Sequence, residues 1–154
     1  MKDELIKKNL DISKTIAMVG VSSIKKEVST SIKRRPSTIV MKYMQEFGYK
    51  VIPVNPFSAG EKVNGETIVE KLTDIKIPID IVDVFRPSKE APIIAKEAIK
   101  VGTKVFWLQY GIQSDEAKKI VELKNIFYIA NKCIKQEYQR LFLKVSPVFP
   151  ALKN

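Results

Sequence analysis

The sequence contains no histidine and only one cysteine, Cys133, among its 154 residues. Without histidine, neither Ser-His-Asp nor Cys-His catalysis is available, and the commonest zinc ligand is missing. A single cysteine cannot form an intrachain disulfide or a cysteine-rich zinc cluster. These absences exclude several classes of hydrolase and zinc protein, and we expect no metal site.

Long hydrophobic runs are missing as well. No apolar stretch approaches the length of a membrane span, and the first eight residues show no hydrophobic core followed by a small-residue cleavage site. We therefore expect no secretory signal, no membrane association and a cytoplasmic protein. The length suits one domain, and we predict a single domain over residues 1–154 with its core at about 15–143.

Acidic residues are too few to balance the basic ones. The 27 lysines and arginines exceed the 17 aspartates and glutamates, which gives a net charge of +10. Such an excess indicates either a lysine-rich surface or an anionic partner, which could be nucleic acid or a phosphate-bearing ligand. Residues 24–35 carry a dense basic stretch without helical or strand period, and we predict a loop there. Its charged residues are Lys25, Lys26, Glu27, Lys33, Arg34 and Arg35.

The stretch at 15–23 combines an apolar run with a glycine and two serines. Residues 15–19 are typical of a buried parallel strand, and Gly20 ends it. Gly20 allows a backbone to approach a ligand, while Ser22 and Ser23 offer hydroxyls and amides. Ligands of open α/β sheets bind beyond the carboxyl ends of the strands, so we predict a ligand site here. An ordinary turn without a ligand is the alternative.

Strand and helix patterns alternate along the rest of the chain. We predict strands at 15–19, 49–54, 79–85, 104–108 and 126–130 and helices at 36–47, 88–101 and 134–143, with a further helix that begins at Ser114. Residues 1–13 are expected to form a short helix or an arm, and residues 57–78 a small strand or turn and a short helix. Alternation of this kind predicts an α/β fold with a mainly parallel sheet of about five or six strands flanked by helices.

Two local features of the third strand and the next helix are specific enough to test. Ser88 is a natural N-cap, and Ile93 and Ile94 stand on the expected buried face of the helix that follows. Asp80 and Asp83 are three positions apart on a strand, which places them on opposite faces. We therefore interpret both as strand-end or capping groups and not as an acid/base pair.

The glycine pattern decides between nucleotide cofactors. The run from Gly20 to Lys25 lacks the second and third glycines of the usual dinucleotide motif, and the second strand ends in Asn55-Pro56 without an acidic residue for a ribose hydroxyl. No Gly-Lys-Ser or Gly-Lys-Thr exists, which excludes a P-loop. NAD(P) is thus a weaker choice than another phosphate-bearing cofactor. An NAD(P)-binding oxidoreductase-like domain and nucleic-acid binding through the basic loop 25–35 stay open as alternatives.

Six short segments, taken in order, carry a family resemblance that covers the chain from about Thr15 to Leu143. They are Val19-Gly20-Val21-Ser22, Arg35-Pro36-Ser37, Val51-Ile52-Pro53-Val54-Asn55-Pro56, Asp80-Ile81-Val82-Asp83-Val84-Phe85-Arg86-Pro87, Trp107-Leu108-Gln109-Tyr110-Gly111-Ile112 and Asn131-Lys132-Cys133-Ile134. Together they resemble the small single-domain CoA-binding protein family, which is similar to the CoA-binding domain of the succinyl-CoA synthetase α subunit.

The resemblance implies a Rossmann-like, doubly wound fold that holds coenzyme A, free or acylated, at the carboxyl edge of its sheet. It assigns three groups to the nucleotide end: the phosphate contacts, a charged helix start and the border of the nucleotide. These are Gly20, Val21 and Ser22; Arg35, Pro36 and Ser37; and Asn55 and Pro56. It places Phe85, Arg86 and Pro87 on the cleft wall, Gln109 and Gly111 along the pantetheine path, and Cys133 at the family's cysteine position.

Other roles are open for several of these residues. Phe85 and Trp107 are also plausible core aromatics, Arg86 a surface ion-pair partner, and Cys133 a small buried hydrophobe instead of a thiol that forms a mixed disulfide with the ligand. The resemblance further implies that ligase chemistry uses a phosphohistidine in a separate domain. Because this chain has no histidine, we expect a binding protein without catalysis of its own.

Overall fold

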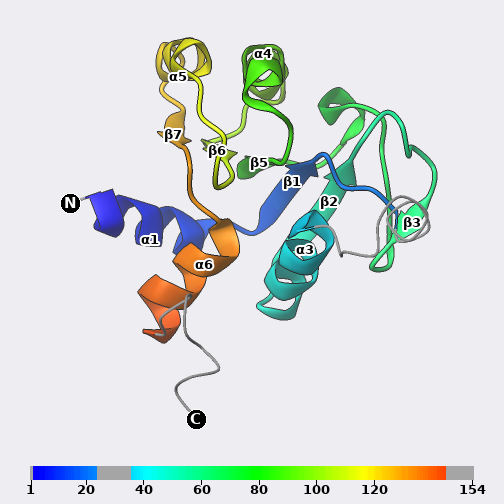
Figure 1. Cartoon of the computed structure of the whole chain (residues 1–154), viewed down its shortest axis with the longest axis horizontal. Coiled ribbons are helices and arrows are strands. Elements are labelled where there is room, and N and C mark those ends of the chain that lie inside the picture. Colours follow the sequence, from blue (N-terminus) through cyan, green and yellow to red (C-terminus); the bar gives the residue numbers. More distant parts are fainter. Residues whose placement is uncertain (1, 24–35, 145–154) are drawn as a thin grey trace.

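A five-stranded parallel sheet forms the centre of the molecule (Figure 1). The computed structural model describes residues 2–23 and 36–144. The strands are β1 (Thr15–Val19), β2 (Lys50–Val54), β5 (Ile81–Val84), β6 (Val105–Leu108) and β7 (Phe127–Ile129), and their order across the sheet is β2-β1-β5-β6-β7. The chain therefore builds the sheet outward in both directions from the adjacent strands β1 and β5. This confirms the α/β, Rossmann-like prediction.

Helices cover both faces of the sheet (Figure 1). One face carries α1 (Lys2–Ile12), α3 (Pro36–Glu46), α6 (Ile134–Tyr138) and its continuation η3 (Gln139–Leu143). The other carries η1 (Leu72–Asp74), α4 (Ala91–Val101) and α5 (Asp115–Glu122). Because both faces are covered, every residue of β5 and β6 is buried, as expected for parallel strands. A short antiparallel hairpin, β3 (Lys62–Val63) and β4 (Glu66–Thr67), follows β2 and precedes η1 along the chain.

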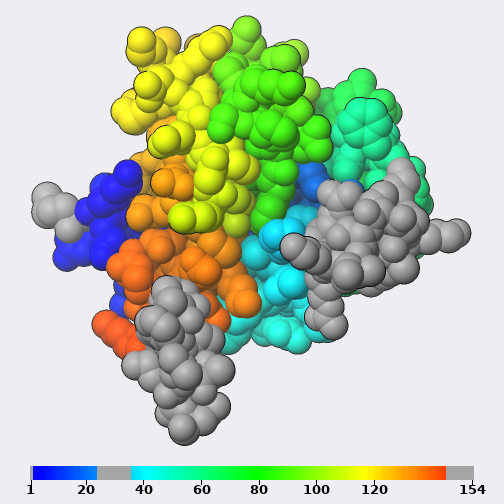
Figure 2. Space-filling view, in the orientation of Figure 1, coloured from blue at the N-terminus to red at the C-terminus, as the bar shows by residue number. Residues whose placement is uncertain are grey.

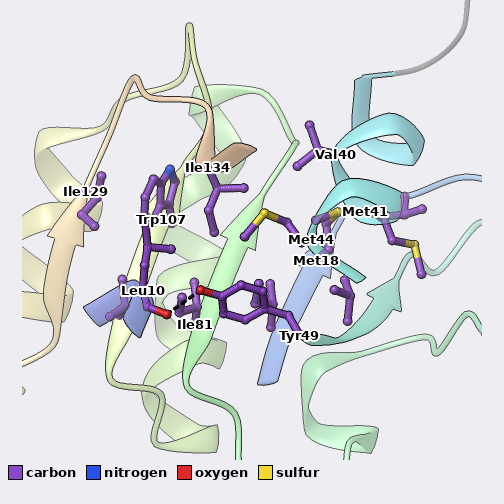
Figure 3. Packing of buried hydrophobic residues seen from close by; sticks show 14 of the residues in the cluster. Leu10, Met18, Val40, Met41, Met44, Tyr49, Ile81, Trp107, Ile129 and Ile134 are labelled. Atoms are coloured by element: carbon purple, nitrogen blue, oxygen red, sulfur yellow. Dashed lines mark hydrogen bonds between the residues drawn. The ribbon is translucent and has the colours of Figure 1, made fainter. Parts of the chain in front are cut away.

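The core under α1, α3 and α6 is built on large side chains (Figure 3). Trp107 is fully buried there, and its indole Nε1 donates a hydrogen bond to the Lys132 carbonyl oxygen at 2.7 Å. The hydroxyl of Tyr49 donates to the Leu10 carbonyl oxygen, which ties the start of β2 to α1. Trp107 is thus a core residue with its single polar atom satisfied, as buried tryptophans usually are.

Most predicted element ends agree with the structure. Gly102 ends α4 in the left-handed conformation, and Ser114 caps α5 by accepting a hydrogen bond from the Ala117 amide. The prediction for Ser88 is wrong: it begins a 3-10 turn, η2 (Ser88–Glu90), and Glu90 is the N-cap of α4. The Ser88 hydroxyl instead accepts from the Gln113 amide, a bond to the loop before α5 that a local sequence pattern does not contain.

The buried face of α4 contains Ile94 and Ala98 as expected but not Ile93. Ile93 is 64% exposed, whereas Ile94 and three alanines face the sheet. Small alanine side chains let the helix axis approach the strands, so the face that contains them is favoured over the one with the bulkier isoleucine. Within residues 2–23 and 36–144, no helix is long and apolar enough to cross a membrane.

Candidate functional site

The connections after β1 and β5 leave the sheet on opposite faces. The chain returns from β1 to β2 through α3 on one face, and from β5 to β6 through α4 on the other. In open α/β sheets this divergence creates a crevice at the carboxyl ends of the two strands, where ligands bind. Here the crevice lies between Gly20, which follows β1, and the pair Phe85 and Arg86, which follows β5.

Gly20 is held in a position that only glycine can occupy. Its φ of +104° belongs to the region that side chains disfavour. A Cβ at this position would also lie 3.0 Å from the Phe85 carbonyl oxygen and 3.1 Å from Cδ of Arg86. The Gly20 amide donates to the Val54 carbonyl oxygen at 2.8 Å, which fixes the turn against β2. The turn after β1 therefore packs directly against the chain after β5, and only glycine permits this approach.

A cavity of about 230 Å³ opens beside Gly20 on the α4 side of the crevice. Figure 2 shows a recess in the surface where the chain after β1 (blue) lies between α4 (green) and the segment after β2 (teal). Its walls come from the ends of β1 and β2, from the chain before η1 and from α4. The lining residues are Val19, Gly20, Val54, Asn55, Pro56, Phe57, Glu70, Lys71, Arg86, Glu90, Ile93, Ile94 and Glu97.

Asn55 joins the two turns that border this cavity. Its Nδ2 donates to the Val21 carbonyl oxygen at 3.1 Å, and its Oδ1 accepts from the Phe57 amide at 2.9 Å. The side chain is 5% exposed, so these bonds also satisfy its buried amide group. Asn55 thus holds the chain after β1 and the chain after β2 in one arrangement, with Pro56 beside it on the cavity wall.

The charge at the mouth of the cavity is organised around Arg86. Its guanidinium binds Glu90 through two bonds, Nε to Oε1 at 3.0 Å and Nη2 to Oε2 at 2.8 Å. This hydrogen-bonded pairing raises the pKa of Arg86 and holds the pKa of Glu90 below its ordinary value, so both groups are charged. Arg86 is thus both an ion-pair partner and a residue of the cavity wall.

The first turn of α3 approaches the same edge of the sheet from the opposite face. Because α3 connects the carboxyl end of β1 to the amino end of β2, its N-terminus lies at the carboxyl edge. Ser37 is buried in this turn and Pro36 is exposed, and the turn carries no acidic residue. The helix dipole therefore presents positive potential there. Val21 and Ser22 are also buried nearby, whereas Arg35 and the basic stretch 24–35 lie outside the described residues.

The predicted residues at the ends of β6 and β7 do not line the cavity. The Oε1 of Gln109 accepts from the Ile134 amide at 3.1 Å, and the Gly111 amide donates to Oδ1 of Asn131 at 2.7 Å. Cys133 is half-buried directly before α6. These residues connect the turn after β6 to the turn after β7. Phe85 packs partly buried against the core, and Pro87 is exposed at the start of η2.

Asp83 does not fit the predicted role of a strand-end group. It lies inside β5, fully buried, and neither carboxyl oxygen has a hydrogen-bond partner within residues 2–23 and 36–144. On the neighbouring strands its register partners are Met18 and Trp107, so its surroundings are mainly apolar. Burial raises the pKa of Asp83 well above the ordinary value. Asp80 does act at a strand end, where its Oδ2 accepts from the Lys14 and Thr15 amides.

Several cavity residues were missed from the sequence. Ile93 was expected on the buried face of α4 and Glu97 was not singled out, although Glu90, Ile93 and Glu97 recur at helical spacing and share one face. The (i, i+4) spacing of Arg86 and Glu90 could have indicated their ion pair from the sequence. Glu70 and Lys71 had no local signal, because a single bridge between Val54 and Val69 brings them to the cavity.

The residues at this edge of the sheet carry charges of both signs. The acid-free N-terminus of α3 favours negative charge, whereas the partly apolar cavity is lined by three carboxylates, Glu70, Glu90 and Glu97, and two cations, Lys71 and Arg86. Across the described ranges, no group of three or more His, Cys, Asp or Glu side chains is arranged to hold a metal ion.

Comparisons with known proteins identify relatives of this chain. The chain is 39% identical over 130 residues to the protein YneT of Bacillus subtilis (strain 168), which covers 84% of this chain and 89% of that protein. It also matches the structure of cell-free ID.343 from Thermus thermophilus with a TM-score of 0.82 and 36% identity, covering 92% of this chain and 100% of the other.

A more distant structure shares the fold alone. RSP, a Rex-family repressor, matches with a TM-score of 0.53 and 15% identity, covering 84% of this chain and 58% of the repressor. The family model that matches is described as a CoA binding domain, and it spans residues 14–139, which include every predicted site residue. The chain belongs to the family of CoA binding domains.

Proposed function

We propose that this protein binds coenzyme A or an acyl-CoA at the carboxyl edge of its sheet and performs no catalysis of its own. The observation that carries the proposal is the cavity at the β1/β5 switch point, where Gly20, Asn55, Pro56 and Arg86 meet. Three residues that the resemblance assigns to the nucleotide end and one that it assigns to the cleft wall line one cavity, in a chain whose family is the CoA binding domain.

In this proposal the cavity takes the nucleotide end of the ligand. Its lining combines apolar surface from Val54, Pro56 and Ile94 with the guanidinium of Arg86. Apolar walls suit the faces of a purine ring, and an arginine fork suits phosphate oxygens. The phosphates lie over Gly20 toward the first turn of α3, where backbone amides and the helix dipole favour negative charge.

The volume of the cavity supports a ligand that continues beyond it. At about 230 Å³, the cavity is smaller than the pockets of about 300–1,000 Å³ that enclose a whole drug-sized ligand. Coenzyme A is longer than such a ligand, so the pantetheine arm extends along the sheet edge past β5. Gln109, Gly111 and Cys133 stand at the ends of β6 and β7 along this path.

The proposed absence of catalysis rests on the composition of the chain. There is no histidine for a phosphohistidine or an acid/base relay. The buried carboxyl of Asp83 lies inside β5 and does not line the cavity, so it is not offered as a base.

Calorimetric titration with coenzyme A, acetyl-CoA, NAD and ATP tests the proposal. We expect binding of coenzyme A in preference to NAD, and an affinity that falls about tenfold or more when Arg86 is changed to alanine, since a charged hydrogen bond contributes about 1.5–3 kcal/mol. The matched control is Arg140→Ala, because Arg140 also forms a two-pronged ion pair, with Asp3, but outside the cavity.

Equal affinity losses in the two arginine variants would argue against the proposed site. Preferential binding of NAD, or of DNA with a steep dependence on salt concentration, would replace the proposed function by one of the two alternative ligand classes.

A further inference from the structure

The side chain of Arg86 already has an anionic partner in the absence of any ligand. Glu90 presents two carboxylate oxygens to the Nε and Nη2 atoms of Arg86, at 3.0 and 2.8 Å. This is the two-pronged geometry with which arginine binds carboxylate and phosphate groups alike. Glu90 therefore occupies the donor positions that a phosphate oxygen of a bound ligand would use.

The pair lies on the cavity wall, beside the turn after β1. Cδ of Arg86 lies 3.1 Å from the point where a Gly20 Cβ would stand, so the arginine stem crosses the turn after β1. Both Arg86 and Glu90 line the cavity. Their side chains are 35% and 36% exposed, so water and solutes reach the pair.

Glu90 has no other visible task at this position. It is the N-cap of α4, yet its side chain makes no capping hydrogen bond. Two further carboxylates, Glu70 and Glu97, line the same cavity. An incoming phosphate thus meets an arginine that is already neutralised and a wall that repels negative charge.

We propose that Glu90 is an internal competitor for Arg86, which an anionic ligand must displace from the guanidinium before it gains that contact. This inference rests on the proposed function, because the ligand considered is coenzyme A. The exchange of one anionic partner for another lowers the net affinity for the ligand. It also favours ligands whose phosphate can lie over Gly20 and engage Arg86 at the same time.

Titration of Glu90→Gln with coenzyme A tests the competition. Glutamine keeps the size of the side chain but offers no charge, and exposed ion pairs contribute about 0.2–1 kcal/mol, so we expect coenzyme A to bind about two- to fivefold more tightly. Glu122→Gln is the matched control, because Glu122 forms an exposed (i, i+4) pair with Lys118 on α5, outside the cavity. Its affinity should equal that of the wild type.

Glu97→Gln separates the release of Arg86 from a general loss of negative charge. Glu97 lines the same cavity and forms no ion pair with any described residue, so its neutralisation should tighten binding less than that of Glu90. Unfolding midpoints of all variants confirm that each is folded.

The outcomes distinguish this inference from the proposed function. If the wild type binds coenzyme A and Glu90→Gln binds equally well or more weakly, Glu90 positions Arg86 or is neutral, and the inference fails alone. An equal gain in Glu90→Gln and Glu97→Gln also overturns it. If neither the wild type nor Glu90→Gln binds coenzyme A, both proposals fail. Binding by Glu90→Gln alone would support the competition.

Discussion

The carboxyl edge of the sheet has two halves that use their polar groups differently. At the ends of β1 and β2, the chain leaves a cavity whose wall holds a backbone turn and an ion pair that water reaches. At the ends of β6 and β7, polar side chains are bonded to the neighbouring turn: Trp107 to Lys132, Gln109 to Ile134 and Asn131 to Gly111.

This difference divides the predicted site residues into those available for binding a ligand and those that stabilise the structure. A side chain whose buried polar atom already satisfies a backbone group cannot leave it for a ligand without leaving that group unpaired. Under the proposed function, we therefore expect the β1/β2 half to supply the contacts that hold the ligand. The β6/β7 half would form the wall along which the ligand arm lies.

The largest effect on stability is expected from adding a side chain at Gly20, in the turn after β1. Gly20→Ala combines the strain of a positive φ with contacts to the Phe85 backbone, and we expect it to lower the free energy of unfolding by about 2–5 kcal/mol. The measurement is chemical denaturation of the variant and the wild type, with coenzyme A titration where the variant is folded.

Gly60→Ala is the matched control for the part of this stability loss that comes from the positive φ alone. Gly60 has a similar φ of +90°, but a Cβ there meets nothing within 4 Å. We expect it to cost about 1–2 kcal/mol. Equal losses of unfolding free energy at the two glycines would mean that the close approach of Phe85 to Gly20 has no energetic consequence. The turn after β1 would then not require glycine for steric reasons.

A smaller effect is expected in the β6/β7 half. Gln109→Leu removes the acceptor of the Ile134 amide and leaves that buried N–H unpaired, which should cost about 1–3 kcal/mol of stability. Denaturation curves and coenzyme A titration are compared for the same variant. We expect the stability loss to exceed any loss of binding free energy. A fall in affinity with unchanged stability would show that Gln109 contacts the ligand directly and would blur the division between the halves.

The sequence predicted the architecture because its signals are local. The apolar run before Gly20 and the Ser114 cap each depend on residues within one element, and both are confirmed. The same holds for Gly102, where a positive φ ends α4. Gly20 was selected as a site residue because it directly follows a strand, whereas Asn55, Pro56 and Arg86 were selected from the family resemblance.

The predictions that failed concern residues whose environment depends on how helices and strands pack against one another. The exposure of Ile93 follows from the alanines that face the sheet, and the loss of the Ser88 cap follows from a bond to Gln113, twenty-five residues away. Lys71 reaches the cavity through the bridge between Val54 and Val69. Packing and long-range pairing decide these positions, and no window of neighbouring residues contains that information.

Asp83 was also misjudged, and it lies on β5, the strand at which the two halves meet. A carboxyl that is fully buried among apolar neighbours, with no partner for either oxygen, is disfavoured in its charged form. Because its pKa is raised in the folded state, its contribution to stability is complete below the unfolded-state pKa of about 3.9 and declines as pH rises toward the folded-state pKa.

The last effect that we predict is the slope that Asp83 gives to the pH dependence of the free energy of unfolding. Between those two pKa values, the wild type should lose about 1.4 kcal/mol per pH unit relative to Asp83→Asn, which carries no titratable group at this position. Urea unfolding at several pH values from 4 upward measures the difference, and Asp115→Asn on the exposed first turn of α5 serves as the control. Parallel stability curves for wild type and Asp83→Asn would mean that Asp83 is ionised in the folded protein. A hydrogen-bond donor or a cation would then have to contact its carboxylate. In that case β5 would belong with the polar β1/β2 half and would not separate it from the β6/β7 half.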